Sequence, residues 1–396
     1  MENFGLLIVA IGILLFALFS RTLEDSLLTL PMIFTVFGWA IGSGADELLP
    51  LSIGHGAMHT LAEITLILVL FSDAAQVNLR LLLKDHTLPT RMLLIGMPLS
   101  ILLGAVVAAW ISPTAPLALA FLIATILTPT DAALGQAIVS SHKVPIRIRQ
   151  AINVESGLND GIALPIVMIC AILTSAAYGT TGAHQPDNLW LFTLLQITLG
   201  PLVGIGIGYA GAKLVDRASA QKSMSMAFQG IAFLSLAATA YLLAEAIGGN
   251  GFIATFVAGL LFGATLKEHS ESLFEFMETE GQLLTMITFL IFGAVMVPLG
   301  LEHATWKTLV LAILYLTVIR MLPIFLSLTG TGLKVPDKLL LGWFGPRGLA
   351  SILFALLILD RFTIPGSEEL LACIVLTVML SIFAHGLSAT PLVNAY

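Results

Sequence analysis

Residues 128–160 read TPTDAALGQAIVSSHKVPIRIRQAINVESGLND, and this stretch decides how the rest of the chain is interpreted. Two apolar, helix-like segments carry polar residues here. The first ends in Thr-Pro-Thr-Asp at 128–131, and the second contains Glu-Ser-Gly-Leu-Asn-Asp at 155–160. Ionisable side chains are costly inside lipid and mark ion or substrate pathways. The stretch therefore predicts an ion site within a membrane, held in place by the other helices.

The composition is that of an all-α polytopic membrane protein. Of the 396 residues, 58% are hydrophobic and 10% are charged, whereas a soluble domain has about 25% charged residues. Apolar runs of about 20 residues recur along the whole chain, as transmembrane helices require. No stretch is basic enough to indicate nucleic acid. Cys170 and Cys373 lie inside apolar runs, which favours small core residues over a disulfide or a metal pair, and no cofactor is expected.

About 13 membrane spans can be placed along the chain. Their ranges are 4–20, 27–44, 58–79, 91–111, 115–140, 146–175, 187–214, 224–247, 250–267, 279–298, 304–329, 337–359 and 367–391. The connections after odd-numbered spans hold 13 of the 17 Lys and Arg residues, and those after even-numbered spans hold only Lys307 and Arg361. Because Lys and Arg are enriched in cytoplasmic loops, we expect a cell-membrane protein whose N-terminus lies outside and whose C-terminus is cytoplasmic.

Two of these spans are interrupted at matching places. Span 5 is interrupted at 128–131, and span 12 is interrupted by Gly-Trp-Phe-Gly-Pro-Arg-Gly at 342–348. The breaks are seven spans apart, an odd number, so two six-span repeats would be inverted in the membrane, with span 7 as a linker. Helices broken by Gly or Pro at corresponding places in two halves point to a transporter site. Pro129 and Pro346 also free backbone carbonyls, which can ligate a cation or accept from a side chain.

Charged residues of opposite sign lie at one depth in the membrane. Asp131 and Asp160 are 12 and 11 residues from the basic residues between spans 5 and 6, which is roughly 16–18 Å of helix. Arg320 lies 13 residues after Lys307, also in mid-span, and Arg347 lies within the break of span 12. Pairing is the least costly way to keep such charges in a membrane.

Helix geometry divides the polar residues of span 6 into two faces. Glu155 and Asn159 share one face, while Ser156 and Asp160 share a face about 100° round the helix. We expect Glu155 to form a structural pair with Arg320, and Asn159 either to donate to Glu155 or to fix the adjoining loop. Asp160 then remains the free carboxylate. Oxygen ligands suit a small hard cation, and burial favours the protonated carboxyl, so a proton and a metal cation can compete for Asp160.

Three further residues complete the candidate site. Asp131 follows the break in span 5, where an acid caps the N-terminus of a half-helix and offsets its dipole. Thr130 would lend its backbone carbonyl or its hydroxyl to the ion. Asp73 is 7 residues from Arg80, about 10 Å from the predicted cytoplasmic edge. It is either an extra ligand or gate in a cytoplasmic funnel, or a solvated acid near a helix end.

These motifs resemble those of the monovalent cation/proton antiporter superfamily, in the NhaP-like branch related to animal Na⁺/H⁺ exchangers. The resemblance covers nearly the whole chain and rests on four segments in order. These are Thr-Pro-Thr-Asp at 128–131, Glu-Ser-Gly-Leu-Asn-Asp at 155–160, Val-Ile-Arg-Met-Leu-Pro at 318–323 and Gly-Pro-Arg-Gly at 345–348. The resemblance implies an NhaA/NhaP-like fold in which two discontinuous helices, spans 5 and 12, cross near the site.

The resemblance also implies roles for individual residues. Asp160 would carry the cation and the proton in turn, with Ser156 and the Thr130 backbone as ligands. Members with Asn before the aspartate resemble electroneutral exchangers, so Asn159 indicates one cation exchanged for one proton. Many members have Phe-Glu in span 3, whereas here the acid of Phe-Ser-Asp is Asp73, one position later. This shift turns the side chain by about 100°, which leaves the assignment of Asp73 as a ligand open.

A division of the chain follows from the same resemblance. A core bundle for transport, about 91–175 and 304–391, would move by an elevator motion against a scaffold, about 4–79 and 187–298. The scaffold would hold two copies together as a homodimer.

The leading interpretation is a secondary transporter, not an enzyme, that exports Na⁺ or Li⁺ as H⁺ enters. Exchange of K⁺ for H⁺ remains an alternative, because both ions use the same ligand types. A passive cation channel usually has a filter loop or a pore ring, and the inverted broken helices argue against it. Asp131 with Asp160 resembles the aspartate pair of an intramembrane protease. The mid-span Arg320 and Arg347 and the absence of a Gly-x-Gly-Asp sequence argue against that.

Overall fold

The computed structural model describes residues 2–24, 27–43, 55–77, 79–84, 86–139, 141–180, 188–266 and 271–395. Within these ranges every regular element is a helix, and each of the predicted spans contains at least one. The elements are α1 (Glu2–Glu24), α2 (Leu30–Ser43), α3 (His55–Ala75), α4 (Leu79–Lys84), α5 (Thr87–Arg91), η1 (Met92–Gly96), α6 (Met97–Ile111), α7 (Leu117–Ile126), η2 (Ala132–Gly135), α8 (Gln136–Val139), α9 (Ile146–Ala177), α10 (Leu189–Ala220), α11 (Met226–Ala246), α12 (Gly251–Thr265), α13 (Glu271–Ile291), η3 (Phe292–Met296), α14 (Val297–Glu302), α15 (Trp306–Leu316), α16 (Val318–Ser327), α17 (Val335–Trp343), α18 (Leu349–Arg361) and α19 (Ser367–Ala395).

The predicted all-helical, multi-pass architecture is confirmed. Seven helical stretches in the described parts of the chain are long and apolar enough to cross a membrane. The shorter apolar helices lie at Leu7–Arg21, Leu30–Gly42, Leu117–Ile126 and Gly251–Thr265. Lys267, the last residue of the ninth predicted span and one of the basic residues assigned to the cytoplasmic side, lies outside the described residues.

Helix ends follow local capping signals. Asn188 accepts a hydrogen bond from Leu191 N at the start of α10, and Asn250 accepts one from Ile253 N at the start of α12. The second cap separates spans 8 and 9, which have little between them except two glycines. Side-chain oxygens at these positions satisfy N–H groups that a helix leaves unpaired.

Besides the two interrupted spans 5 and 12, three spans deviate from a regular α-helix in the part of the chain that the structure describes. The π-helical segments η1 and η3 each end two residues before a proline, Pro98 or Pro298, which cannot donate a backbone hydrogen bond. Span 11, expected to be continuous, is divided at Thr317 into α15 and α16. Thr317 Oγ1 donates to Ile313 O, a side-chain bond of the kind that bends helices.

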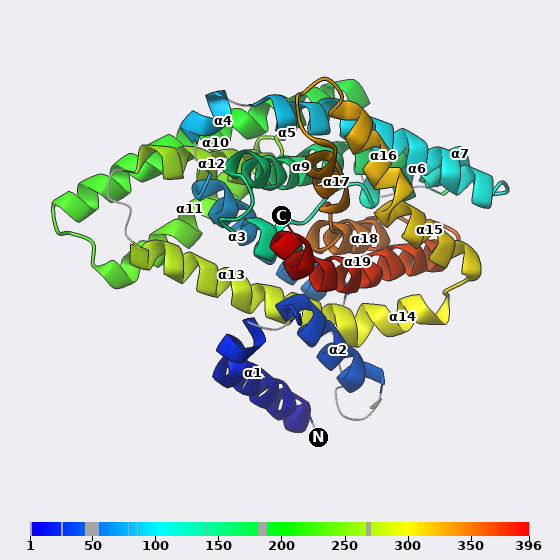
Figure 1. Ribbon diagram of the computed structural model, residues 1–396, viewed down its shortest axis with the longest axis horizontal. Coiled ribbons are helices and arrows are strands. Elements are labelled where there is room, and N and C mark those ends of the chain that lie inside the picture. Colours follow the sequence, from blue (N-terminus) through cyan, green and yellow to red (C-terminus); the bar gives the residue numbers. More distant parts are fainter. Residues whose placement is uncertain are drawn as a thin grey trace.

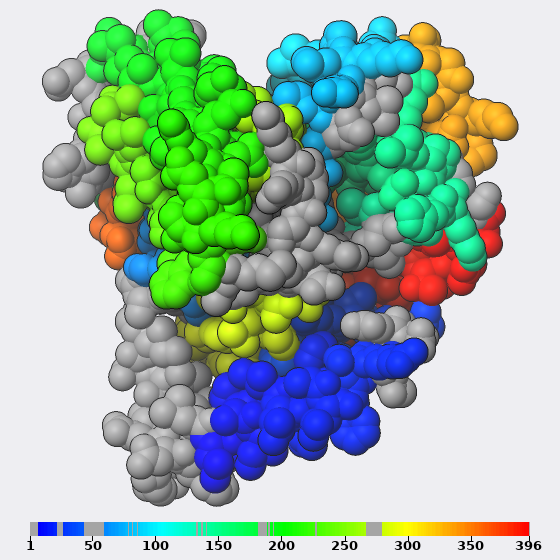
Figure 2. Space-filling model, turned by 90° about the vertical axis from the view of Figure 1, so that its left-hand side faces the viewer, coloured from blue at the N-terminus to red at the C-terminus, as the bar shows by residue number. Residues whose placement is uncertain are grey.

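The elements that carry the candidate site lie in the middle of the molecule. In Figure 1, α9, α17 and α18 are central, whereas α1, α10 and α11 lie toward the periphery. Figure 2 shows a notch at the top of the surface between the green helices around α10 and the light-blue segment that precedes α6. One of two buried hydrophobic clusters draws its members only from spans 4–6 and 11–13 and the short connections at their ends. The other cluster packs these spans against the remaining helices.

Candidate functional site

The two broken helices meet at their breaks. Residues 127–131 separate α7 from η2, and residues 344–348 separate α17 from α18. Asp131 N donates to the carbonyl oxygen of Pro346 at 2.8 Å. A backbone bond between the two breaks shows that the chain crosses itself here, as expected for paired discontinuous helices.

Side chains satisfy carbonyl groups that the first break releases. Ser351 Oγ, on α18, donates to Ile126 O at 2.9 Å. Thr128 Oγ1 donates to Ala124 O at 2.6 Å. Buried backbone groups without partners are costly, so these contacts help the chain to hold an unwound segment in the protein interior.

Asp131 caps a half-helix, but not the one that follows it in sequence. Its Oδ2 accepts a hydrogen bond from Leu349 N, the first residue of α18, at 2.9 Å. A Cβ added at Gly348 would lie 2.0 Å from this oxygen, so only glycine permits the approach. The crossing brings the N-terminus of α18 to Asp131, and its partial positive charge favours a carboxylate there.

Residues of α9 hold the unwound segment of span 5. Ser156 Oγ donates to Thr130 O at 2.6 Å, and Asn159 Nδ2 donates to Thr130 Oγ1 at 2.8 Å. Thr130 N donates back to Asn159 Oδ1 at 3.3 Å. Asn159 therefore fixes the adjoining loop, which was one of its two expected roles. Thr130 and Ser156 are thereby held together as a group of oxygen atoms.

Asp160 lies one helical turn beyond Ser156 on α9. Its side chain is 3% exposed, and Oδ1 has no hydrogen-bond partner among the residues that the structure describes. A buried carboxylate oxygen without a partner is costly. Either a proton or a cation removes this cost, so the geometry suits a group that exchanges one for the other.

Helix α12 packs closely against α9 around Asp160, a contact that was not predicted from the sequence. Asn250 Nδ2 donates to Gly161 O at 3.1 Å. A Cβ at Gly157 would lie 1.9 Å from the Phe256 ring, so the helices approach through glycine. Glycines four residues apart on one face were a usable signal for such packing.

Glu155 and Arg320 form the expected ion pair. Arg320 Nη1 lies 2.5 Å from Glu155 Oε1, and Nη2 lies 2.7 Å from Oε2. Both residues are at most 2% exposed. A Cβ at Gly345 would lie 2.3 Å from Arg320 Nε, which ties this pair to the break of span 12. The bidentate geometry neutralises both charges.

Arg347 is held by polar groups of the span 12 break and of α19. Its Nη1 donates to Gly345 O at 2.7 Å, and its backbone N donates to Ser381 Oγ at 2.7 Å. His385 lies 3.1 Å from Ser381 Oγ through Nδ1 and 2.9 Å from Trp343 O through Nε2. Ser381 and His385, which were not predicted from the sequence, thus position the second break from α19.

Asp73 lies beside α9 but toward its beginning. Its backbone oxygen accepts from Asn153 Nδ2 at 3.4 Å, and its side chain is half-buried. Asn153 precedes Asp160 by 7 residues, about 10 Å along the helix. Asp73 therefore lies between Asp160 and the predicted cytoplasmic end.

These features define the chain as a secondary transporter of the type with two crossing broken helices beside a buried carboxylate. The family described as "Sodium/hydrogen exchanger, transmembrane" matches residues 6–395. The chain belongs to this family.

Several relatives carry the name of an antiporter. The chain is 29% identical over 299 residues to the Na⁺/H⁺ antiporter NhaH of Halobacillus dabanensis, covering 72% of this chain and 71% of that protein. It is 27% identical to the Na⁺/H⁺ antiporter NhaG of Bacillus atrophaeus, covering 79% and 59%. It is 24% identical to the K⁺/H⁺ antiporter NhaP of Alkalimonas amylolytica, covering 90% and 61%. The chain thus spans about 60 to 70% of the length of these relatives.

The fold is similar to that of a solved antiporter. The sodium proton antiporter MjNhaP1 of Methanocaldococcus jannaschii at pH 8 superimposes with a TM-score of 0.76 at 17% identity, covering 98% of this chain and all of that one. An electron-microscopy structure of the same protein gives a TM-score of 0.79 at 19% identity, covering 98% and 96%. The predicted fold class is confirmed.

Proposed function

We propose that the protein exchanges Na⁺ or Li⁺ for H⁺ at Asp160. The observation that carries this proposal is the buried Asp160 Oδ1, which has no hydrogen-bond partner among the described residues. In the proton-loaded state the carboxyl is neutral. In the cation-loaded state the carboxylate and nearby oxygens of Thr130 and Ser156 ligate the ion, since such ligands suit a small hard cation.

The neighbouring charges favour an exchange of one cation for one proton. Glu155 is neutralised by Arg320, and Asp131 caps α18. Asn159 is neutral and is engaged with Thr130. Asp160 remains as the carboxylate that changes its charge, so its two loaded states carry the same net charge. The proposed cycle is therefore electroneutral.

We infer that spans 4–6 and 11–13, about 91–175 and 304–391, form a core bundle that carries the site. One hydrophobic cluster is drawn only from these spans and their short connections, which supports treating them as a unit, while the larger cluster packs them against the scaffold helices. The scaffold, about 4–79 and 187–298, would hold two copies together as a homodimer. The glycine contact between α9 and α12 then lies at the boundary across which an elevator motion slides. In this proposal the protein lies in a cell membrane with its N-terminus outside and its C-terminus in the cytoplasm, and H⁺ enters the cell as Na⁺ leaves.

Asp73 is proposed as an accessory acid on the cytoplasmic approach. Asp73 contacts α9 at Asn153, which is closer to the start of this helix than Asp160 is. This position supports a role in attracting or relaying cations before they reach the site. Its half-burial fits a residue that water reaches from that end.

Exchange of K⁺ is the second candidate, because a relative that covers 90% of the chain is named a K⁺/H⁺ antiporter. The test is dye-monitored proton movement in proteoliposomes with Na⁺, Li⁺ or K⁺ across pH. We expect Na⁺ and Li⁺ to drive proton movement, Asp160→Asn to abolish it, and the exposed control Asp360→Asn to retain it. A larger response to K⁺ than to Na⁺ would select the second candidate, and full activity in Asp160→Asn would refute the site.

A further inference from the structure

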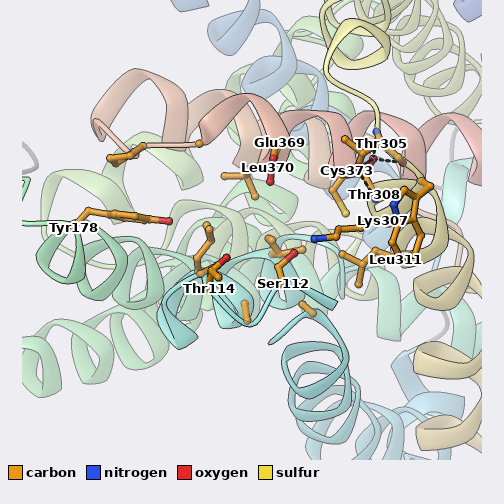
Figure 3. A pocket seen from close by; sticks show the side chains of 18 residues that line it. Ser112, Thr114, Tyr178, Thr305, Lys307, Thr308, Leu311, Glu369, Leu370 and Cys373 are labelled. Atoms are coloured by element: carbon orange, nitrogen blue, oxygen red, sulfur yellow. Dashed lines mark hydrogen bonds between the residues drawn. The ribbon is translucent and has the colours of Figure 1, made fainter. Parts of the chain in front are cut away.

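A cavity of about 450 Å³ opens at the end of the core bundle opposite the Lys- and Arg-rich connections. It lies among the C-terminal ends of α6 and α9, the N-terminal ends of α15 and α19, and α7. Figure 3 shows Lys307 and Glu369 reaching into this space from α15 and α19, with Ser112 and Thr114 facing them from the α6–α7 side. The cavity is separate from the crossing of the broken helices.

Two charged side chains of opposite sign line this cavity without pairing. No ion pair within 4.0 Å and no hydrogen bond of either side chain, Lys307 or Glu369, is found in the described part of the chain. Lys307 is also one of two basic residues in the connections on this side of the membrane. A positive charge runs against the usual loop bias here. A cation and an anion held apart across a cavity match a ligand that carries both charges.

The surroundings of the cavity place it at the edge of the lipid. Trp110, at the end of α6, is 80% exposed, and Trp306, at the start of α15, is 70% exposed. Exposed apolar residues continue from each tryptophan along its helix, namely Leu99, Leu102 and Val106 on α6, and Leu309, Val310 and Ile313 on α15. Exposed tryptophans at the ends of apolar helix surfaces are typical of the membrane–water interface.

We propose that this cavity binds the headgroup of a phosphoethanolamine lipid. Lys307 and the hydroxyl groups of Ser112 and Thr114 face the phosphate, and Glu369 accepts hydrogen bonds from the ammonium group. The acyl chains lie along the apolar surfaces below Trp110 and Trp306. A choline headgroup cannot donate hydrogen bonds to Glu369, and a glycerol headgroup has no ammonium to pair with it. The site therefore selects for a primary ammonium next to a phosphate.

The test is native mass spectrometry of the purified chain titrated with lipids that share acyl chains and differ in headgroup. We expect the ethanolamine lipid to bind about tenfold more tightly than the choline or glycerol lipids. Lys307→Gln and Glu369→Gln should each weaken its binding about tenfold, because each removes a charged partner. Glu368→Gln and Arg361→Gln are matched controls on the same side, outside the cavity lining, and should bind as the original chain does.

Several results would overturn the proposal. One is equal binding of the three headgroups. Another is unchanged selectivity in the double variant Lys307→Gln/Glu369→Gln, whose fold is checked by its elution profile. Competition by soluble glycerophosphoethanolamine at the same concentration as the lipid would assign the site to a soluble ligand instead. Equal binding of the ethanolamine and glycerol lipids would show that Glu369 takes no part.

Discussion

The substitution Arg320→Gln removes the cation of a bidentate ion pair in which Arg320 is 2% and Glu155 is 1% exposed. Breaking a buried pair from one side costs about 3–5 kcal/mol, because the remaining carboxylate has lost its partner. At about 2.1 cal/mol/K of unfolding entropy per residue, a cooperative chain of 396 residues changes by about 0.8 kcal/mol per degree. The thermal midpoint should therefore fall by about 4–6 °C.

The assay is the thermal midpoint of purified protein in one detergent, followed by size-exclusion elution after heating. Arg320→Gln, Glu155→Gln and the double variant are compared, with the exposed Arg361→Gln as control. Because the double variant leaves no unpaired charge, it should lose less stability than the sum of the two single losses, by about 2 kcal/mol. A single variant within about 1 °C of the original chain, or strictly additive losses, would refute a structural role for the pair.

Three further outcomes test other parts of the site. Gly348→Ala should lower both the thermal midpoint and transport, because its Cβ would lie 2.0 Å from Asp131 Oδ2. The control is Gly206→Ala, whose Cβ would have no atom within 4 Å, and it should leave both unchanged. Ser156→Ala loses the 2.6 Å bond to Thr130 O and should raise the Na⁺ concentration for half-maximal exchange about tenfold while the thermal midpoint changes little; an unchanged Na⁺ dependence would remove Ser156 from the site. Exchange in vesicles clamped with a K⁺ ionophore should not respond to an imposed membrane potential, and a clear response would show that more than one charge moves in each cycle.

Local sequence was enough to locate the spans and the two breaks that meet, but not the division of span 11 at Thr317. Long apolar runs have one stable form in lipid, so the spans could be placed from hydrophobicity alone. Pro129 and Pro346 marked the breaks because proline removes a backbone donor wherever it lies. The pairing of Glu155 with Arg320 was also predictable, because few charges lie at that depth and each needs a partner.

Contacts that depend on the crossing of the two breaks were not predictable in detail. Which half-helix Asp131 caps depends on where span 12 passes, as does the donation from Ser351 to Ile126. Asn159 had two plausible partners, and the position of Thr130 decides between them. The contact from Asn250 to Gly161 joins residues 89 positions apart, and no local pattern specifies that register.

The central claim is that a proton and a cation compete for Asp160. Calorimetry of Na⁺ binding in two buffers of different ionisation enthalpy measures the protons released for each ion bound. At a pH at which Asp160 starts protonated, we predict about one proton per Na⁺, with the apparent affinity falling about tenfold for each further pH unit of acidification. Asp160→Asn should neither bind Na⁺ nor release a proton. Na⁺ binding that does not depend on pH, or proton release that persists in Asp160→Asn, would contradict the account.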